Sequence, residues 1–160
     1  MRRKDREIKN LDEVFAVVKN CQVVHVAMAE EGKPYVVALN FGFDRRGDDL
    51  VLYLHSAPEG RKMDILKKNS EVYFQMDCAG RLIKGKPGNP CSYSWEFESV
   101  MGSGQVEFIE NEREQTYALN RIIQHLDNAD SWFAFPPQML AKTCVYRIVS
   151  GDFTGKRHGL

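Results

Sequence analysis

Hydrophobic and polar positions follow two periods along this chain, and the two-residue period dominates. Period-two alternation predicts strands over six segments: 22–29, 34–43, 50–55, 72–76, 93–109 and 143–149. The longest segment contains Gly102 and Gly104, and glycine inside a strand pattern is typical of a bulge or bend. Dividing that segment into two strands of a bent sheet gives about seven strands.

The 3.6-residue helical period occurs between the strands. It predicts a first helix over 11–20, a second after residue 59, a third from residue 112 through Leu126, and a short fourth helix. Helix starts are indicated by four residue pairs: Asn10 with Glu13, Ser56 with Glu59, Asn111 with Glu114, and Pro136 with Pro137.

Short spacing between strands and the hairpin-like neighbours predict a mostly antiparallel sheet, because a parallel sheet needs a crossover between every pair of strands. We therefore expect a mainly β fold, a small barrel that is closed or nearly closed, with flanking helices. Residues 1–160 are long enough for one domain. The segment 81–90 holds three basic residues, two glycines and two prolines, and it predicts an exposed loop.

Charge and composition exclude several classes of partner. The 22 basic and 22 acidic side chains cancel, so the sequence lacks the cationic surplus of a dedicated nucleic-acid binder. Apolar runs are much shorter than the ~20 residues of a membrane helix, so no membrane association is expected. The basic N-terminus lacks the apolar stretch of a secretory signal, which predicts a cytoplasmic protein.

Cysteine and histidine positions do not predict a metal site. Cys21, Cys78, Cys91 and Cys144 contain no C-x-x-C pair. The histidines likewise lack ligand spacing. We expect the cysteines to be small core or near-surface residues in a reducing compartment, most simply buried structural thiols.

The segment 55–62 contains the strongest candidate site. Arg61 and Lys62 fall in the first turn of a predicted helix, where the helix dipole disfavours a cation by ~0.3–1 kcal/mol. A bound phosphate would explain them, since it accepts hydrogen bonds from the open N–H groups and from both side chains. The alternative is a solvated basic turn that Glu59 and Asp64 neutralise.

His55 ends the preceding strand, so it would lie beside any ligand whose phosphate occupied the helix start. Two interpretations stay open for it, a catalytic role and a hydrogen-bonded structural role. Strand aromatics are also open to two interpretations, as core or interface residues or as a platform for a planar ring. They are Tyr35, Phe41, Phe43, Tyr93, Trp95 and Phe97.

Four segments in series resemble the 5-nitroimidazole resistance (Nim) proteins, which belong to the pyridoxamine 5′-phosphate oxidase-like, FMN-binding split barrels. The segments are 1–8, 34–43, 53–62 and 98–104. Together they cover nearly the whole chain in the family's order.

The resemblance implies a homodimer with flavin sites at the subunit interface and FMN as cofactor, with FAD or haem as alternatives. It implies that Arg61 and Lys62 hold the phosphate, and that His55 and Ser56 contact the flavin. His55 is also the implied active-site residue. The resemblance further assigns flavin contacts to strand residues: Val36, Val37, Asn40 and Ser99.

The implied activity is that of a flavin-dependent oxidoreductase that reduces a small oxidised substrate such as a nitroimidazole. Two alternatives stay open: a non-catalytic flavin- or haem-binding or storage protein, and a structural interaction domain. The chain departs from the family at 152–160, which lacks the arginine-rich signature for pyridoxal phosphate and so argues against vitamin B6 oxidation. Ala38 stands where many relatives have proline.

Overall fold

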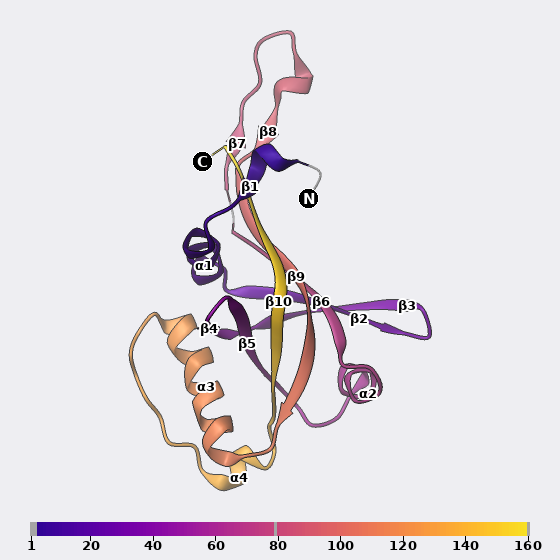
Figure 1. Ribbon diagram of the computed structural model, residues 1–160, viewed down its shortest axis with the longest axis vertical. Helices are drawn as coiled ribbons and strands as arrows, with labels where there is room; N and C mark the ends of the chain where they lie inside the picture. The colour runs from indigo at the N-terminus through magenta and orange to yellow at the C-terminus, as the bar shows by residue number, and fades with distance from the viewer. Residues whose placement is uncertain (1–2, 79, 160) are drawn as a thin grey trace.

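The computed structural model describes residues 3–78 and 80–159, which fold around one strongly bent antiparallel sheet (Figure 1). Its hydrogen-bonded strand order is β3-β2-β6-β9-β10-β5-β4, with β1 added to β10, and β7 pairs with β8 separately. The strands are β1 Glu7–Ile8, β2 Val23–Glu30, β3 Lys33–Asn40, β4 Gly42–Arg46, β5 Asp49–Ser56, β6 Glu71–Cys78, β7 Leu82–Ile83, β8 Ser94–Trp95, β9 Phe97–Ile109 and β10 Cys144–His158.

Four α-helices flank the described part of the sheet. They are α1 Leu11–Asn20, α2 Arg61–Lys68, α3 Glu112–Asp127 and α4 Pro137–Leu140, and short 3-10 turns cover Lys4–Arg6 and Pro90–Ser92. Helix α3 packs on β4 and β5, whereas α2 lies near β2 on the other side of the sheet (Figure 1). Within residues 3–78 and 80–159, no helix combines the length and apolar composition needed to span a bilayer.

The predicted mainly β fold with flanking helices is confirmed, and the barrel is split. Strands β3 and β4 are the two ends of the strand path. In the described chain no ladder of hydrogen bonds joins these two strands, so the sheet curls without closing. The family resemblance predicted this split form.

Alternating side chains of β5 divide the interior into two cores. Leu50, Leu52 and Leu54 face the inside of the curled sheet, and Val51 and Tyr53 face α3. All five are buried, and each apolar side chain contributes ~1.5–3 kcal/mol when it leaves water. Strand β5 therefore separates the two cores, and the candidate site begins at its C-terminal end.

The predicted strand over 34–43 is wrong at its C-terminal end, because the chain turns at Phe41. Phe41 is fully buried, and its ring centroid lies 4.6 Å from that of His125 on α3. A Cβ at Gly42 would lie 2.4 Å from the backbone carbonyl carbon of Arg121. Only glycine permits α3 to pack this close, so the run divides into β3 and β4.

The predicted division of 93–109 at its glycines is also wrong. The segment holds two strands, but β8 and β9 separate at Glu96, and β9 is continuous through both glycines from Phe97 to Ile109. The irregularity lies in its neighbour β10, whose register shifts between Val149 and Asp152. A Cβ at Gly102 would lie 2.5 Å from the Asp152 carbonyl oxygen. The glycine therefore allows a close approach to a bulge in the other strand, and β10 continues beyond its predicted end at Val149 to His158.

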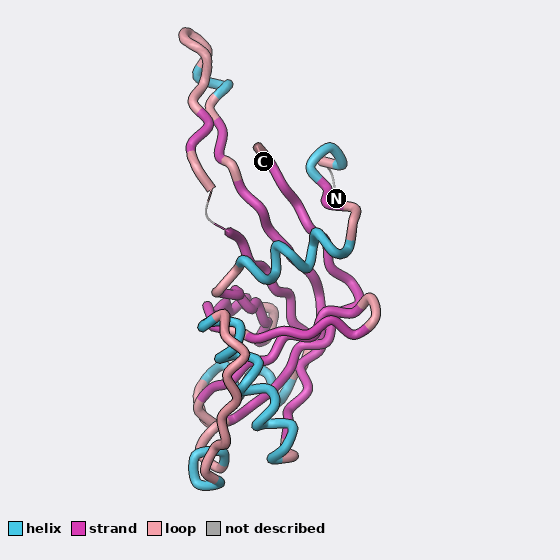
Figure 2. The backbone as a smooth tube through the Cα atoms, turned by 90° about the vertical axis from the view of Figure 1, so that its left-hand side faces the viewer, coloured by secondary structure: helices cyan, strands magenta, loops and turns pink. Residues whose placement is uncertain are grey.

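The predicted exposed loop 81–90 belongs to a hairpin arm, defined here as residues 80–96, which extends beyond the rest of the molecule (Figure 2). Strands β7 and β8 pair near its root, where Arg81 Nε lies 2.5 Å from Glu96 Oε2. Its exposed apolar side chains are Leu82, Tyr93 and Trp95.

His125 gives the fold a predictable response to acid. Its Nε2 lies 2.7 Å from the Cys21 carbonyl oxygen. Burial lowers the pKa of His125 below its usual 6.5, and the charge of Arg121 adds to this. The unfolded chain then binds more protons below that pH, so we expect the free energy of unfolding to fall as the pH drops below about 6.5.

Urea unfolding at several pH values between about 5 and 8 measures this loss. The variant His125→Gln keeps a donor for Cys21 but cannot titrate, so its unfolding free energy should change less with pH. An equal pH dependence in the variant and the wild type would contradict the assignment to His125.

Candidate functional site

The turn between β5 and α2 forms an open helix start. Helix α2 begins at Arg61, and its N-cap, Gly60, has a φ of 120°, a conformation that favours glycine. The Gly60 carbonyl accepts from Met63 N at 2.8 Å and from Asp64 N at 3.1 Å. Because Gly60 has no side chain to cap the helix, the N–H groups of Arg61 and Lys62 stay available to an anion.

The predicted capping pair of Ser56 with Glu59 is wrong. Ser56 Oγ donates to the Ala57 carbonyl at 2.8 Å and lies 3.1 Å from Met63 Sδ. Its hydroxyl therefore faces the first turn of α2 but caps none of the backbone N–H groups of that turn. This lack of a cap strengthens the case for a ligand at the helix start.

Lys62 is a half-buried cation at this helix start. Its Nζ lies 5.9 Å from the ring centroid of Tyr146, and burial lowers its pKa. Among the described residues Lys62 has no carboxylate in ion-pair contact, unlike Arg61 and Lys68. A cation that is partly removed from water and lacks a counter-ion is stabilised by an anionic ligand.

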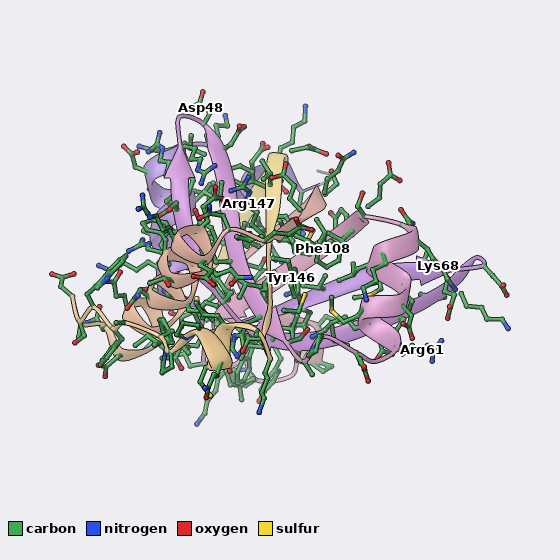
Figure 3. The ribbon with its side chains drawn as sticks, turned by 90° about the horizontal axis from the view of Figure 1, so that it is seen from below. Asp48, Arg61, Lys68, Phe108, Tyr146 and Arg147 are labelled. Carbon is green, nitrogen blue, oxygen red and sulfur yellow. The ribbon has the colours of Figure 1, made fainter. Side chains whose placement is uncertain are left out.

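Arg61 projects outward from the same turn (Figure 3), and its side chain is 57% exposed. Its guanidinium carbon lies 4.6 Å from the ring centroid of Tyr35, and its Nε lies 3.6 Å from Glu30 Oε2. This ion pair is exposed, so it stabilises the fold little. Within the described chain the counter-ion of the basic turn is thus Glu30, in place of the Glu59 and Asp64 of the alternative interpretation.

His55 is at the exposed end of β5, opposite Val145 of β10. Burial of its ring lowers the pKa of His55, and the charge of Lys62 lowers it further. The imidazole is therefore neutral at pH 7, with one nitrogen able to donate and the other able to accept. In the part of the chain that the structure describes, no hydrogen bond fixes this ring, so the structural interpretation lacks support.

Two residues near the site gave no signal in the sequence, because only the register of β10 brings them there. Cys144 lies opposite Ser56, and burial raises the pKa of its thiol, while Lys67 and Lys62 act in the opposite direction. Tyr146 is fully buried, and its hydroxyl lacks a hydrogen-bond partner among the described residues. An unpartnered buried hydroxyl costs ~1–3 kcal/mol, which a water or ligand atom would recover.

The predicted flavin contacts on β3 do not share one face. Val36 and Asn40 are on the exposed face of the strand, and Asn40 Nδ2 donates to the Gln22 carbonyl at 3.0 Å. Val37 points the other way and packs against the interior core. Their roles toward a flavin stay predictions.

Ser99 is distant from the helix start within one chain. It is buried on β9, opposite Asp77 of β6 and Lys156 of β10. Cys144, which lies beside α2, is at the opposite end of β10 from Lys156. The fold therefore brings together His55, Ser56, Arg61 and Lys62 but separates Ser99 from them.

An apolar surface follows the exposed side of β3, β2 and β6, and we call it the open sheet face. Ala27 pairs with Val36 on one side and with Tyr73 on the other, so these three residues share a face. Val36 is 54% exposed and Tyr73 is 49% exposed. Large side chains with this exposure on a central part of a sheet are typical of an interaction surface.

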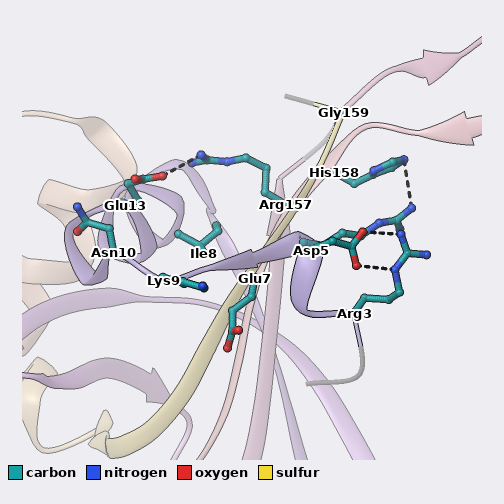
Figure 4. Close-up of a pocket in the computed structure, with 11 residues that line it drawn as sticks. Arg3, Asp5, Glu7, Ile8, Lys9, Asn10, Glu13, Arg157, His158 and Gly159 are labelled. Carbon is teal, nitrogen blue, oxygen red and sulfur yellow. Dashed lines mark hydrogen bonds and ion pairs between the residues drawn. The ribbon is translucent and has the colours of Figure 1, made fainter.

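A separate pocket lies where the N-terminal segment crosses the end of β10 (Figure 4). Its charges are largely paired, Arg3 with Asp5 and Arg157 with Glu13. None of the predicted site residues lines it, and it resembles a structural junction.

Comparison with known proteins identifies relatives of this architecture. The family model for pyridoxamine 5′-phosphate oxidase matches residues 10–157. A proposed 5-nitroimidazole antibiotic resistance protein from Bacteroides thetaiotaomicron is similar at 31% identity, with 94% of this chain and 88% of that chain covered and a TM-score of 0.74. The comparison with curated proteins finds no match.

Two further solved structures share the fold at lower identity. A flavocytochrome from Azotobacter vinelandii has 19% identity and a TM-score of 0.80, with 100% of this chain and 72% of that chain covered. An FAD-binding protein from Mesorhizobium loti has 22% identity and a TM-score of 0.69, with 96% and 98% covered. Because the family model covers nearly all of the sequence, the chain belongs to the pyridoxamine 5′-phosphate oxidase family.

Proposed function

We propose that this protein binds FMN and reduces a small oxidised substrate such as a nitroimidazole. The observation that carries the proposal is Lys62, a half-buried cation without an acidic partner in the described chain, beside Arg61 at an uncapped helix start. This arrangement fits a terminal phosphate, which carries two negative charges and several acceptor oxygens.

Each side chain of the turn has a distinct task in this proposal. Arg61 would donate two parallel hydrogen bonds to the phosphate and Lys62 would supply a point charge, together with the N–H groups of the first turn. His55, neutral at pH 7, would contact the flavin or the substrate and could hold or release a proton there. The bound flavin supplies the redox chemistry, accepting electrons from a donor and passing them to the substrate.

A second copy of the chain would complete the site. The open sheet face leaves Val36, Ala27 and Tyr73 without a partner in the single chain, and a two-fold dimer would cover the same surface on both copies. Val36 and Asn40 would then lie at the subunit interface, where the resemblance predicts the flavin.

The relatives support the choice of substrate and cofactor. The Bacteroides protein is named for 5-nitroimidazole resistance and has 31% identity over nearly the whole chain. The Mesorhizobium protein is named for FAD binding. FAD carries the same riboflavin 5′-phosphate as one half of a pyrophosphate with one negative charge on each phosphate, so the doubly charged terminal phosphate of FMN fits the basic turn better.

The proposal is tested by loading the purified protein with FMN and adding a nicotinamide donor and then a nitroimidazole, without oxygen. We expect bleaching of the flavin absorbance with the donor and its return with the nitroimidazole. His55→Gln should keep the flavin but slow the return by about 10²-fold, the usual loss when a proton-transfer group is removed.

His158→Gln, in the separate N-terminal pocket, is the matched control and should react like the wild type. A protein that retains flavin but exchanges no electrons would be a binding or storage protein. Absence of flavin binding would reject both functions.

A further inference from the structure

Two cysteines that are distant in sequence meet in the fold. Cys21 follows the last turn of α1, and Cys78 is the last residue of β6. Their Sγ atoms are 3.1 Å apart. Because a disulfide bond is about 2.05 Å long, the two sulfurs need to approach by only ~1 Å to become bonded.

Access to this pair is asymmetric. Cys21 is buried, with 1% of its surface exposed, whereas Cys78 is half-buried. Cys78 lines a surface pocket together with Asn20, Gly80, Arg81, Glu96, Phe97 and Glu98. Cys78 is therefore the partner of the pair that is nearer to solvent.

The expectation of buried thiols is confirmed for Cys21 and is wrong for Cys91. Cys91 is exposed in the arm, and Cys144 is half-buried next to α2. Among the described residues no other cysteine sulfur lies in contact with either of these two. Cys21 and Cys78 are therefore the pair whose sulfur atoms are in contact.

Local electrostatics make this pair slow to react without a strong oxidant. Burial raises the pKa of both thiols, and the charges of Asp77 and Glu98 raise them further. Both sulfurs are therefore protonated at neutral pH, and only a small fraction is thiolate. The pair would stay reduced under ordinary conditions and respond to a rise in oxidant.

We propose that Cys21 and Cys78 form a redox modification site, in which a peroxide converts the two thiols to a disulfide. The Cys78 thiolate attacks one peroxide oxygen, so the S–O bond forms, the O–O bond breaks, and water leaves after protonation. The Cys21 sulfur then displaces the hydroxyl from Cys78, the S–S bond forms, and a second water leaves. The two thiols lose two electrons, which reduce one peroxide molecule.

The bond would tie α1 to the root of the arm. Gly80 begins the arm two residues after Cys78. A Cβ at Gly80 would lie 1.5 Å from the Glu96 carbonyl oxygen, so the two backbone segments at the root of the arm are in close contact. Oxidation would therefore fix the end of α1 to the end of β6, two residues before the arm.

To test this proposal, the reduced full-length protein is treated with hydrogen peroxide, and its remaining thiols are alkylated with iodoacetamide. The peptides are then mapped by mass spectrometry. We expect a peptide pair joined through Cys21 and Cys78, lighter by two hydrogen atoms than the two reduced peptides. The melting temperature should rise by several degrees, because the bond closes a long loop of the unfolded chain.

The double variant Cys91→Ser/Cys144→Ser should form the same bond, and Cys78→Ser should show neither the joined peptides nor the rise in melting temperature. Full alkylation of Cys21 and Cys78 in the unfolded sample, after peroxide treatment well beyond that needed to oxidise the exposed Cys91, would overturn the proposal. So would a bond that joins only Cys91 residues of two molecules. Peptide mapping of the wild type decides the matter even where a variant folds poorly.

Discussion

Alanine at both Arg61 and Lys62 is expected to weaken FMN binding by about 10²- to 10⁴-fold. Each side chain would lose a charge-assisted hydrogen bond to the phosphate, worth ~1.5–3 kcal/mol, and each 1.4 kcal/mol is about tenfold in affinity. The affinity is measured by titrating the protein into FMN and following the quenching of flavin fluorescence. Removing Lys62 also removes a half-buried cation, so the unliganded variant should unfold at a similar or higher temperature than the wild type.

Lys67→Ala/Lys68→Ala is the matched control, because it removes the same charge from the last turn of the same helix. Those two lysines are exposed, and we expect the control to bind FMN within about threefold of the wild type, as screened surface charges contribute little. Equal losses in the two double variants would show that net charge, and not the helix start, controls binding. Unchanged binding in the Arg61 and Lys62 variant would reject the phosphate site.

Lysine in place of Tyr73 is expected to separate the proposed dimer into monomers and to release the flavin with it. Tyr73 is half-exposed on the β6 side of the open sheet face, and its paired neighbours Ala27 and Ser103 offer no acidic partner. Burying an unpaired ammonium between two copies costs several kcal/mol, so we expect the dimer to weaken by about 10²-fold or more. Light scattering after size-exclusion chromatography measures the mass, and absorbance of the same peak measures the flavin.

The control for this variant is Leu126→Lys, at the last turn of α3 on another surface of the molecule. It adds the same charge at an exposed apolar residue, and a cation is favourable at a helix C-terminus. We expect a flavin-loaded dimer for this control. A monomeric wild type, or a Tyr73→Lys protein that stays dimeric, would exclude the open sheet face as the interface.

Local patterns were sufficient to predict most of the elements. Period-two alternation indicated the strands, and the predicted caps were confirmed at Asn10, whose Oδ1 accepts from Asp12 N, and at Asn111, whose Oδ1 accepts from Arg113 N. These features depend on residues close together in sequence. The basic turn at Arg61 was predictable for the same reason, since its cations and helix start lie within a few residues.

Features that depend on contacts between residues distant in the sequence could not be predicted. The position of Tyr146 beside Lys62 follows from the register of β10 against β5, and the meeting of Cys21 with Cys78 follows from the packing of α1 on β6. The glycine at 102 signalled a close approach, but the bulge it accommodates is in another strand. The spacing of residues along the sequence does not indicate which distant segments come into contact.

The position of β10 in the sheet constrains how the protein folds as it is made by the ribosome. This strand is last in sequence, yet it lies between β9 and β5. A nascent chain that has not yet reached Cys144 holds two unconnected sheet fragments, each with an unpaired edge that can bind other chains. Native assembly must therefore wait for translation of the final strand, and a chaperone that shields these edges should raise the yield of folded protein.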